Sequence, residues 1–160
     1  MYIQVAFAAA ALAAVAQTGS PRPQFGDYPA PSVFSGRPAD PVLITAEERR
    51  FRTVIRRGLL EGFGVQDGET GRELGKSGAN FAGHYVIVQW GCGSPCLMAA
   101  IVDLANGPVL PPPFHQGSGN SYFQVPWAFP RSPALSYRRD SRLLIASICE
   151  TTRCAASTTS

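Results

Sequence analysis

Residues 80–103 read NFAGHYVIVQWGCGSPCLMAAIVD, and this stretch decides the fold. Apolar and β-branched side chains dominate 84–90 and 97–103, whereas glycine, serine, proline and cysteine gather between them. Short apolar runs bounded by turn residues are typical of strands that pair through a hairpin. The stretch therefore predicts two strands, His84 to Trp90 and Leu97 to Asp103, joined by a glycine- and cysteine-rich loop.

Further strand signals follow this hairpin. Asn106-Gly107 is a tight-turn signal and predicts a return strand at Val109-Leu110. Ser121 to Val125 reads as a short strand and Arg142 to Cys149 as a strongly apolar one. Residues 151–160 are small and polar, so we expect no strand there, and Arg142 to Cys149 then lies at a sheet edge or pairs with an earlier strand. The expected core residues are Val86, Val88, Ile101, Leu143 and Ile145.

One amphipathic helix precedes the strands. Thr45-Ala46-Glu47-Glu48 is a capping box, and the helix is expected to run to about Glu61, with Gly62 and Gly64 as its stop. Apolar and basic side chains then fall on opposite faces: Phe51, Val54, Ile55 and Leu59 on one, and Arg49, Arg50, Arg52, Arg56 and Arg57 on the other. The expected fold is α+β, with this helix packed on a small antiparallel sheet of four or five strands.

The N-terminal part carries an export signal. Val5 to Ala16 has the length of a signal-peptide apolar region, and Ala14-Val15-Ala16 fits a cleavage site, although no Lys or Arg precedes the run. Residues 1–16 are therefore predicted to be a signal peptide, and the protein to be periplasmic or secreted. Residues 17–41 contain six prolines and are expected to form an extended or disordered tether. The single domain is expected over 42–160.

The composition of the chain limits the classes of partner that it can be expected to bind. The chain has 160 residues and a net charge of +3, with 45% hydrophobic and 16% charged residues. This composition excludes disorder throughout, and no apolar run reaches the roughly 18–20 residues of a transmembrane helix. The small net charge does not indicate nucleic acid as a partner.

The four cysteines, Cys92, Cys96, Cys149 and Cys154, predict two disulfides in an exported protein. Three connectivities are open. The local pairing of Cys92 with Cys96 and of Cys149 with Cys154 is slightly favoured, because each pair lies at a strand end beside turn residues. A crossed pairing such as Cys92 with Cys149 closes a much longer loop and stays open on the sequence alone.

The motifs around the central hairpin resemble those of a group of small exported bacterial proteins of unknown function. The shared features are Asn-Phe-Ala-Gly-His-Tyr at 80–85, Trp-Gly-Cys-Gly at 90–93 with a second cysteine, and the later segment 137–146 with Asp-Ser-Arg-Leu-Leu-Ile. The resemblance implies a periplasmic or secreted location and no particular activity.

Three kinds of chemistry were considered for the cysteine loop. A thiol or Cys–His enzyme would use Cys92 as nucleophile and His84 as base, but the strand between them separates the two by about 20 Å. A redox pair of Cys92 and Cys96 would lack a helix N-terminus to stabilise a thiolate. A zinc or copper site from His84, Cys92, Cys96 and His115 needs reduced thiols. We therefore expect no metal, no cofactor and no catalytic residue, and the Cys92 enzyme remains the alternative.

Ligand binding is the leading functional hypothesis. Trp127, with Tyr122 and Phe129 nearby, is the best candidate for an exposed aromatic platform, and His84 is a weaker candidate. The arginine face of the helix is expected to be solvated, with contact to lipid headgroups or an acidic partner as its alternative. The predicted function is a non-catalytic exported module that binds a protein or an envelope component.

Overall fold

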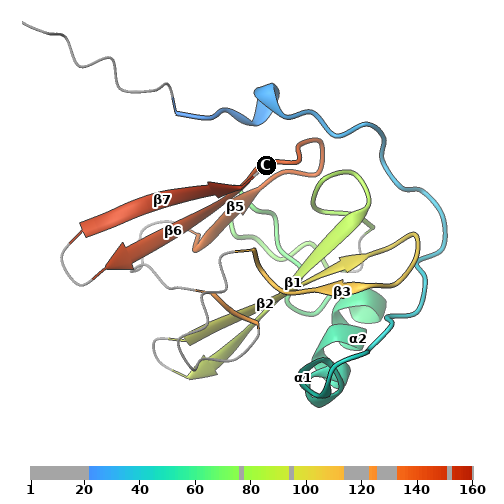
Figure 1. Ribbon diagram of the computed structural model, residues 1–160. Coiled ribbons are helices and arrows are strands. Elements are labelled where there is room, and N and C mark those ends of the chain that lie inside the picture. Colours follow the sequence, from blue (N-terminus) through green and yellow to red (C-terminus); the bar gives the residue numbers. More distant parts are fainter. Residues whose placement is uncertain are drawn as a thin grey trace, which may run out of the picture.

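The fold of the chain is α+β, as expected, in the computed structural model of Figure 1. The structure describes residues 22–75, 78–93, 96–113, 123–125, 133–150 and 153–159, and at 124, 147–150 and 153–159 it describes the backbone alone. Within these residues the strands form two antiparallel sheets, β1 to β4 and β5 to β7, rather than one sheet of four or five strands.

The quoted hairpin is the centre of the first sheet. β1 (Tyr85–Gly93) pairs with β2 (Cys96–Asp103), with Val86 opposite Val102 and Val88 opposite Ala100. β3 (Val109–Leu110) and β4 (Gln124–Val125) both pair with β2. The predicted hairpin and the return strand after Asn106-Gly107 are therefore confirmed, whereas the short strand expected from residue 121 is confirmed only at 124–125.

The second sheet was largely missed. It consists of β5 (Leu135–Tyr137), β6 (Leu144–Glu150) and β7 (Arg153–Thr159), with β6 in the middle. The prediction of no strand after residue 150 was wrong. Of the two positions expected for the apolar strand, the sheet edge was wrong, and pairing with an earlier strand is confirmed by β5. Small polar residues give little sequence signal, but β7 gains its backbone partners along the whole of β6, from Leu144 to Glu150.

The helical segment forms as two pieces, α1 (Ala46–Arg50) and α2 (Arg52–Glu61). The capping box is confirmed, because the Thr45 side chain accepts a hydrogen bond from the Glu48 backbone N–H at 3.1 Å and Glu48 Oε2 accepts one from the Thr45 N–H at 2.9 Å. At Phe51 the backbone leaves helical values, with φ −96° and ψ 12°. Its N–H still donates to Glu47 O and its carbonyl accepts from the Ile55 N–H, so the hydrogen-bond ladder continues.

The first sheet is buried on both faces. One face packs on α2 through a cluster that includes Ile55, Val86 and Val88. The opposite face packs on β5 and β6 through a second cluster that includes Ile87 and Leu144. The molecule therefore has three layers, helix, sheet and sheet, which explains why the strand sequence is apolar almost without alternation. Among the expected core residues, Val86, Val88, Ile101 and Leu143 are buried, whereas Ile145 is only half-buried.

A proline-rich segment, residues 22–43, runs along the outside of these layers, and we call it the strap (Figure 1). It begins with a short 3-10 turn, η1 (Phe25–Asp27), beside the second sheet, where Pro29 bridges Ser141. It then passes the first sheet and enters α1. The part expected as an extended or disordered tether is thus extended from residue 22 onward and hydrogen-bonded to the domain.

Candidate functional site

A cleft of about 870 Å³ separates the strap from α2. One wall is the strap from Phe34 to Pro41, and the other is the outer side of α2. The side chains that matter for its chemistry are apolar or basic: Phe34, Arg37, Arg56, Leu59, Leu60 and Arg139. We call this space the strap cleft.

Backbone hydrogen bonds fix the strap wall on both sides of the cleft. The Phe34 N–H donates to Gly83 O at 2.7 Å, and the Ala39 N–H donates to Leu104 O at 2.9 Å. The Val42 N–H donates to Gly107 O at 2.8 Å. The wall between these anchors is therefore held in place without a ligand.

Two glycines allow this close approach. Gly83 and Gly107 have φ values of 81° and 89°, in the region that favours glycine. A Cβ at Gly83 would overlap the carbonyl of Ser32, and one at Gly107 would overlap the carbonyl of Asp40. The Asn-Phe-Ala-Gly-His-Tyr motif and the Asn-Gly turn therefore each provide a glycine against which the strap backbone packs.

The helical wall combines a cation with exposed apolar surface. Leu59 packs against the core, whereas Leu60 is 64% exposed. Arg56 lies one turn before Leu60, so the two side chains are neighbours on the helix surface. The predicted separation of faces is confirmed, because Ile55 is fully buried and the arginines of α1 and α2 are exposed.

The three arginines of the cleft are not neutralised by the protein. Arg37, Arg56 and Arg139 make no ion pair within the described residues, where the ion pairs are Arg57 with Glu61 at 3.0 Å and Arg138 with Asp140 at 2.9 Å. The hydrogen bonds and charge of Asp140 raise the pKa of Arg138. Asp40 is the one acidic residue in the described part of the cleft lining. The cleft therefore has an excess of positive charge beside apolar side chains.

Exposed apolar side chains continue beyond the cleft. Phe63 is 43% exposed and lies under the Arg57 guanidinium, whose central carbon is 4.4 Å from the ring centroid. Ile44, just before α1, is 73% exposed. The helical side of the molecule thus presents guanidinium groups next to uncovered apolar surface.

The buried polar residues serve the fold. The Asn80 amide donates to the Gln66 and Ile87 carbonyls at 3.0 and 3.2 Å and accepts from the Ile87 N–H at 2.8 Å. Gln89 donates to the Tyr137 hydroxyl at 3.0 Å, and this hydroxyl donates to Gln66 O at 3.0 Å. Burial raises the pKa of Tyr137 well above its usual range. This network ties the loop after α2 to both sheets.

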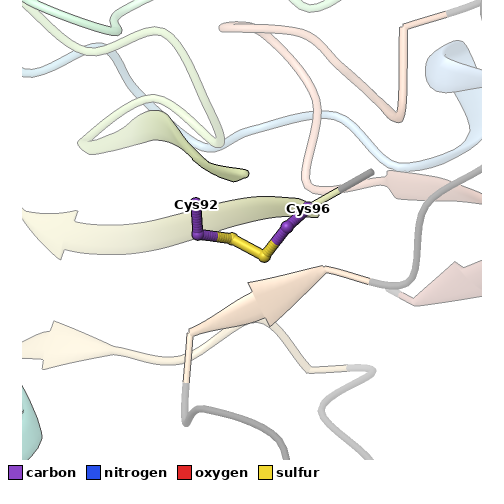
Figure 2. Close-up of a disulfide and its surroundings, with 2 residues drawn as sticks. All are labelled: Cys92 and Cys96. Atoms are coloured by element: carbon purple, nitrogen blue, oxygen red, sulfur yellow. A yellow bond between two sulfur atoms is a disulfide. The ribbon is translucent and has the colours of Figure 1, made fainter. Parts of the chain in front are cut away.

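The end of the first hairpin carries a disulfide between Cys92 and Cys96, with Cα atoms 5.0 Å apart (Figure 2). The local pairing is thus confirmed for these two cysteines, and the crossed pairing of Cys92 with Cys149 is wrong. The backbone register of β6 and β7 sets Cys149 opposite Cys154, whose side chains lie outside the described part. In this structure Cys92 has no free thiolate to act as a nucleophile.

The other candidate residues are placed only in part. Trp127, Tyr122, Phe129 and His115 lie outside the described residues. His84 is half-buried, with its ring centroid 4.1 Å from that of Tyr85, and does not line the strap cleft. Trp90 packs against Phe51 and Phe123, with ring centroids 5.3 and 5.7 Å away. The role of ligand contact, predicted for Trp127, Tyr122, Phe129 and His84, therefore stays a prediction.

Within the described part of the chain, no group of three or more His, Cys, Asp or Glu side chains is arranged to hold a metal ion. None of the helices found there has the length and apolar character that crossing a membrane requires.

Sequence reasoning found Arg56 but missed Arg37 and Arg139. These two come from the strap and from the turn after β5, and only the path of the strap brings them to the same cleft as α2. No spacing of residues in the sequence predicts that Arg37 and Arg139 line the same cleft as α2.

Comparison with protein-family models, with curated proteins and with solved structures finds no match to this chain.

Proposed function

We propose that the protein is an exported, non-catalytic module that binds an anionic component of the cell envelope, namely the headgroup surface of an anionic membrane. The observation that carries the proposal is the outward side of α2, where Arg56 and Arg57 stand beside the exposed Leu60 and Phe63. Arginine attracts anionic headgroups, and the neighbouring apolar side chains lose contact with water at the acyl boundary.

The absence of local neutralisation strengthens this interpretation. Arg52 and Arg56 lie one turn apart and make no ion pair within the described residues. Arg57, by contrast, is paired with Glu61 four residues further along the helix. The export signal predicted over 1–16 and the disulfide are consistent with work outside the cytoplasm.

Vesicle cosedimentation tests the proposal. The protein should bind phosphatidylglycerol vesicles and not phosphatidylcholine vesicles, and binding should weaken as salt is raised, because salt screens exposed charges. Arg52→Glu combined with Arg56→Glu should lower the partition coefficient about tenfold or more, since each basic residue near an anionic surface contributes about 1 kcal/mol. Arg22→Glu combined with Arg72→Glu, at two exposed arginines outside α1 and α2, makes the same change of charge and is the control that should leave binding unchanged.

The outcomes separate the two partners that the sequence suggested. Equal binding to both vesicle types, or no binding to either, would contradict the membrane proposal. If a soluble poly-glutamate peptide binds instead, and does so through Arg52 and Arg56, the partner is an acidic protein.

A further inference from the structure

We propose that the strap cleft binds a single-chain anionic amphiphile, with its acyl chain on Phe34, Leu59 and Leu60 and its acidic headgroup paired with Arg37, Arg56 and Arg139. The inference rests on the proposed function and names the molecule that the protein would take from an anionic surface.

The charge balance selects the headgroup. Among the described residues that line the cleft, three arginines stand against one aspartate, Asp40, which gives this lining an excess of two positive charges. A carboxylate or a phosphate satisfies guanidinium groups through charge-assisted hydrogen bonds. The three arginines come from the strap, from α2 and from the turn after β5, so the cleft presents guanidinium groups from three separate parts of the chain.

The apolar lining selects the tail. Leu60 stays 64% exposed beside Arg56, and Phe34 and Leu59 are only half-buried. A small inorganic anion would leave this apolar surface in water, whereas an acyl chain would cover it. Each methylene that is buried raises affinity about fourfold, so the fit can be measured through chain length.

The shape of the site favours one bound molecule over a flat surface or a long polymer. About 870 Å³ lies within the range of small-ligand sites. The strap wall is anchored at Phe34, Ala39 and Val42, so the cleft is largely preformed. A planar membrane would contact the exposed arginines and Phe63 on the helical side and would not enter this concave space.

Calorimetric titration of the purified protein with short amphiphiles, below their micelle concentrations, tests the inference. Decanoate and decyl phosphate should bind saturably, and hexanoate and octanoate progressively more weakly than decanoate. Acetate, inorganic phosphate and the neutral decyl maltoside should bind far more weakly. A lower Kd for decyl phosphate than for decanoate would assign a phosphate headgroup, and the reverse order would assign a carboxylate.

Variants locate the binding. Arg37→Gln combined with Arg139→Gln should raise the Kd of decanoate about tenfold, because each exposed ion pair changes affinity by about two- to fivefold. Leu60→Gln, at an exposed side chain that the fold does not need, should weaken the dependence on chain length. Arg72→Gln, at an exposed arginine outside the cleft, is the control for removal of one positive charge.

Several results would overturn the inference. These are an unchanged Kd in the Arg37 and Arg139 double variant, equal affinity for decyl maltoside, or binding of poly-glutamate through Arg37 without any binding of amphiphiles. The protein could instead bind vesicles through Arg52 and Arg56 while no amphiphile binds it saturably. That result would contradict the cleft ligand and leave the proposed function intact. Failure of both assays would remove both.

Discussion

Ser141 holds the strap against the second sheet. Its side chain is 1% exposed, and its Oγ lies 2.8 Å from Phe25 O and 3.0 Å from Tyr28 O, so its proton is shared between two strap carbonyls. The same oxygen accepts a hydrogen bond from the Leu143 N–H at 3.2 Å. A single hydroxyl therefore joins the beginning of the strap to the segment that leads into β6.

Replacing Ser141 with Ala should loosen the strap at this end. The Leu143 N–H would lose its partner, and the carbonyls of Phe25 and Tyr28 would each keep only the hydrogen bond from a backbone N–H, that of Tyr28 and of Arg142 respectively. The free energy of unfolding should therefore fall by about 1–3 kcal/mol. Denaturant unfolding measures this change, and limited proteolysis should show faster cleavage within 22–43. The exposed Ser35→Ala is the control. Equal protease resistance of both variants would mean that the strap does not depend on this contact.

Asp67 gives the loop after α2 a dependence on pH. Its Oδ1 accepts hydrogen bonds from the Thr70 hydroxyl at 2.7 Å, the Thr70 N–H at 2.8 Å and the Glu69 N–H at 3.2 Å. These bonds, led by that of the Thr70 hydroxyl, hold the pKa of Asp67 below its ordinary value of 3.8. The carboxylate therefore stabilises the fold above the unfolded pKa, and this stability is lost as pH falls through the lower folded pKa.

Asp67→Asn should flatten this part of the pH profile. Urea unfolding from about pH 5 to about pH 2 should show a smaller loss of stability for the variant than for the parent, because the amide oxygen still accepts hydrogen bonds but does not titrate. Identical profiles for the two proteins would show that Asp67 is not held ionised by the turn.

Phe51 is the residue that joins the helical element to the core. Its ring lies 5.3 Å from that of Trp90 and 6.0 Å from that of Phe123, both centroid to centroid. Phe51→Asp would place an unpaired charge among these rings, so we expect a loss on the order of 3–5 kcal/mol, seen as a collapse of the thermal unfolding transition. Thr45→Ala should cost only about 1 kcal/mol, because it removes one cap hydrogen bond. If the Phe51→Asp variant unfolds at the same temperature as the parent, the Phe51 ring does not pack on Trp90 and Phe123 as described.

The elements that the sequence predicts are those with a strong local signal. The capping box at Thr45 and the turn at Asn106-Gly107 depend on neighbouring residues, and both are found. The helix break at Phe51 was not predicted, because no glycine or proline marks it. β7 was missed for a related reason, since its strand character comes from pairing with β6 and not from its own small polar residues.

At the scale of the molecule, the order of the three layers could not be predicted from the sequence. The apolar hairpin was expected to pack on the helix, and it does, but its second face is covered by β5 and β6. Tyr137 reaches Gln66 and Gln89 from a strand nearly fifty residues further along than Gln89, and no local pattern reveals such a contact. The strap cleft has the same origin, because Arg37, Arg56 and Arg139 meet only after the whole chain has folded.

The oxidation state of Cys92 and Cys96 decides between the two functional hypotheses, the non-catalytic binding module and the thiol enzyme. Cys92 and Cys96 are joined at the exposed end of the first hairpin, and a loop this short contributes roughly 2 kcal/mol in the chain-entropy model. Titration of the folded, unreduced protein with a thiol reagent should therefore find Cys92 and Cys96 unreactive, and mass mapping should recover their peptides as one linked species. Cys92→Ser combined with Cys96→Ser should lower stability by about that amount and leave vesicle binding unchanged, because neither residue lies on the helical face. Reactive thiols at Cys92 and Cys96 in the folded protein, together with loss of function in the double variant, would instead favour the thiol enzyme centred on Cys92.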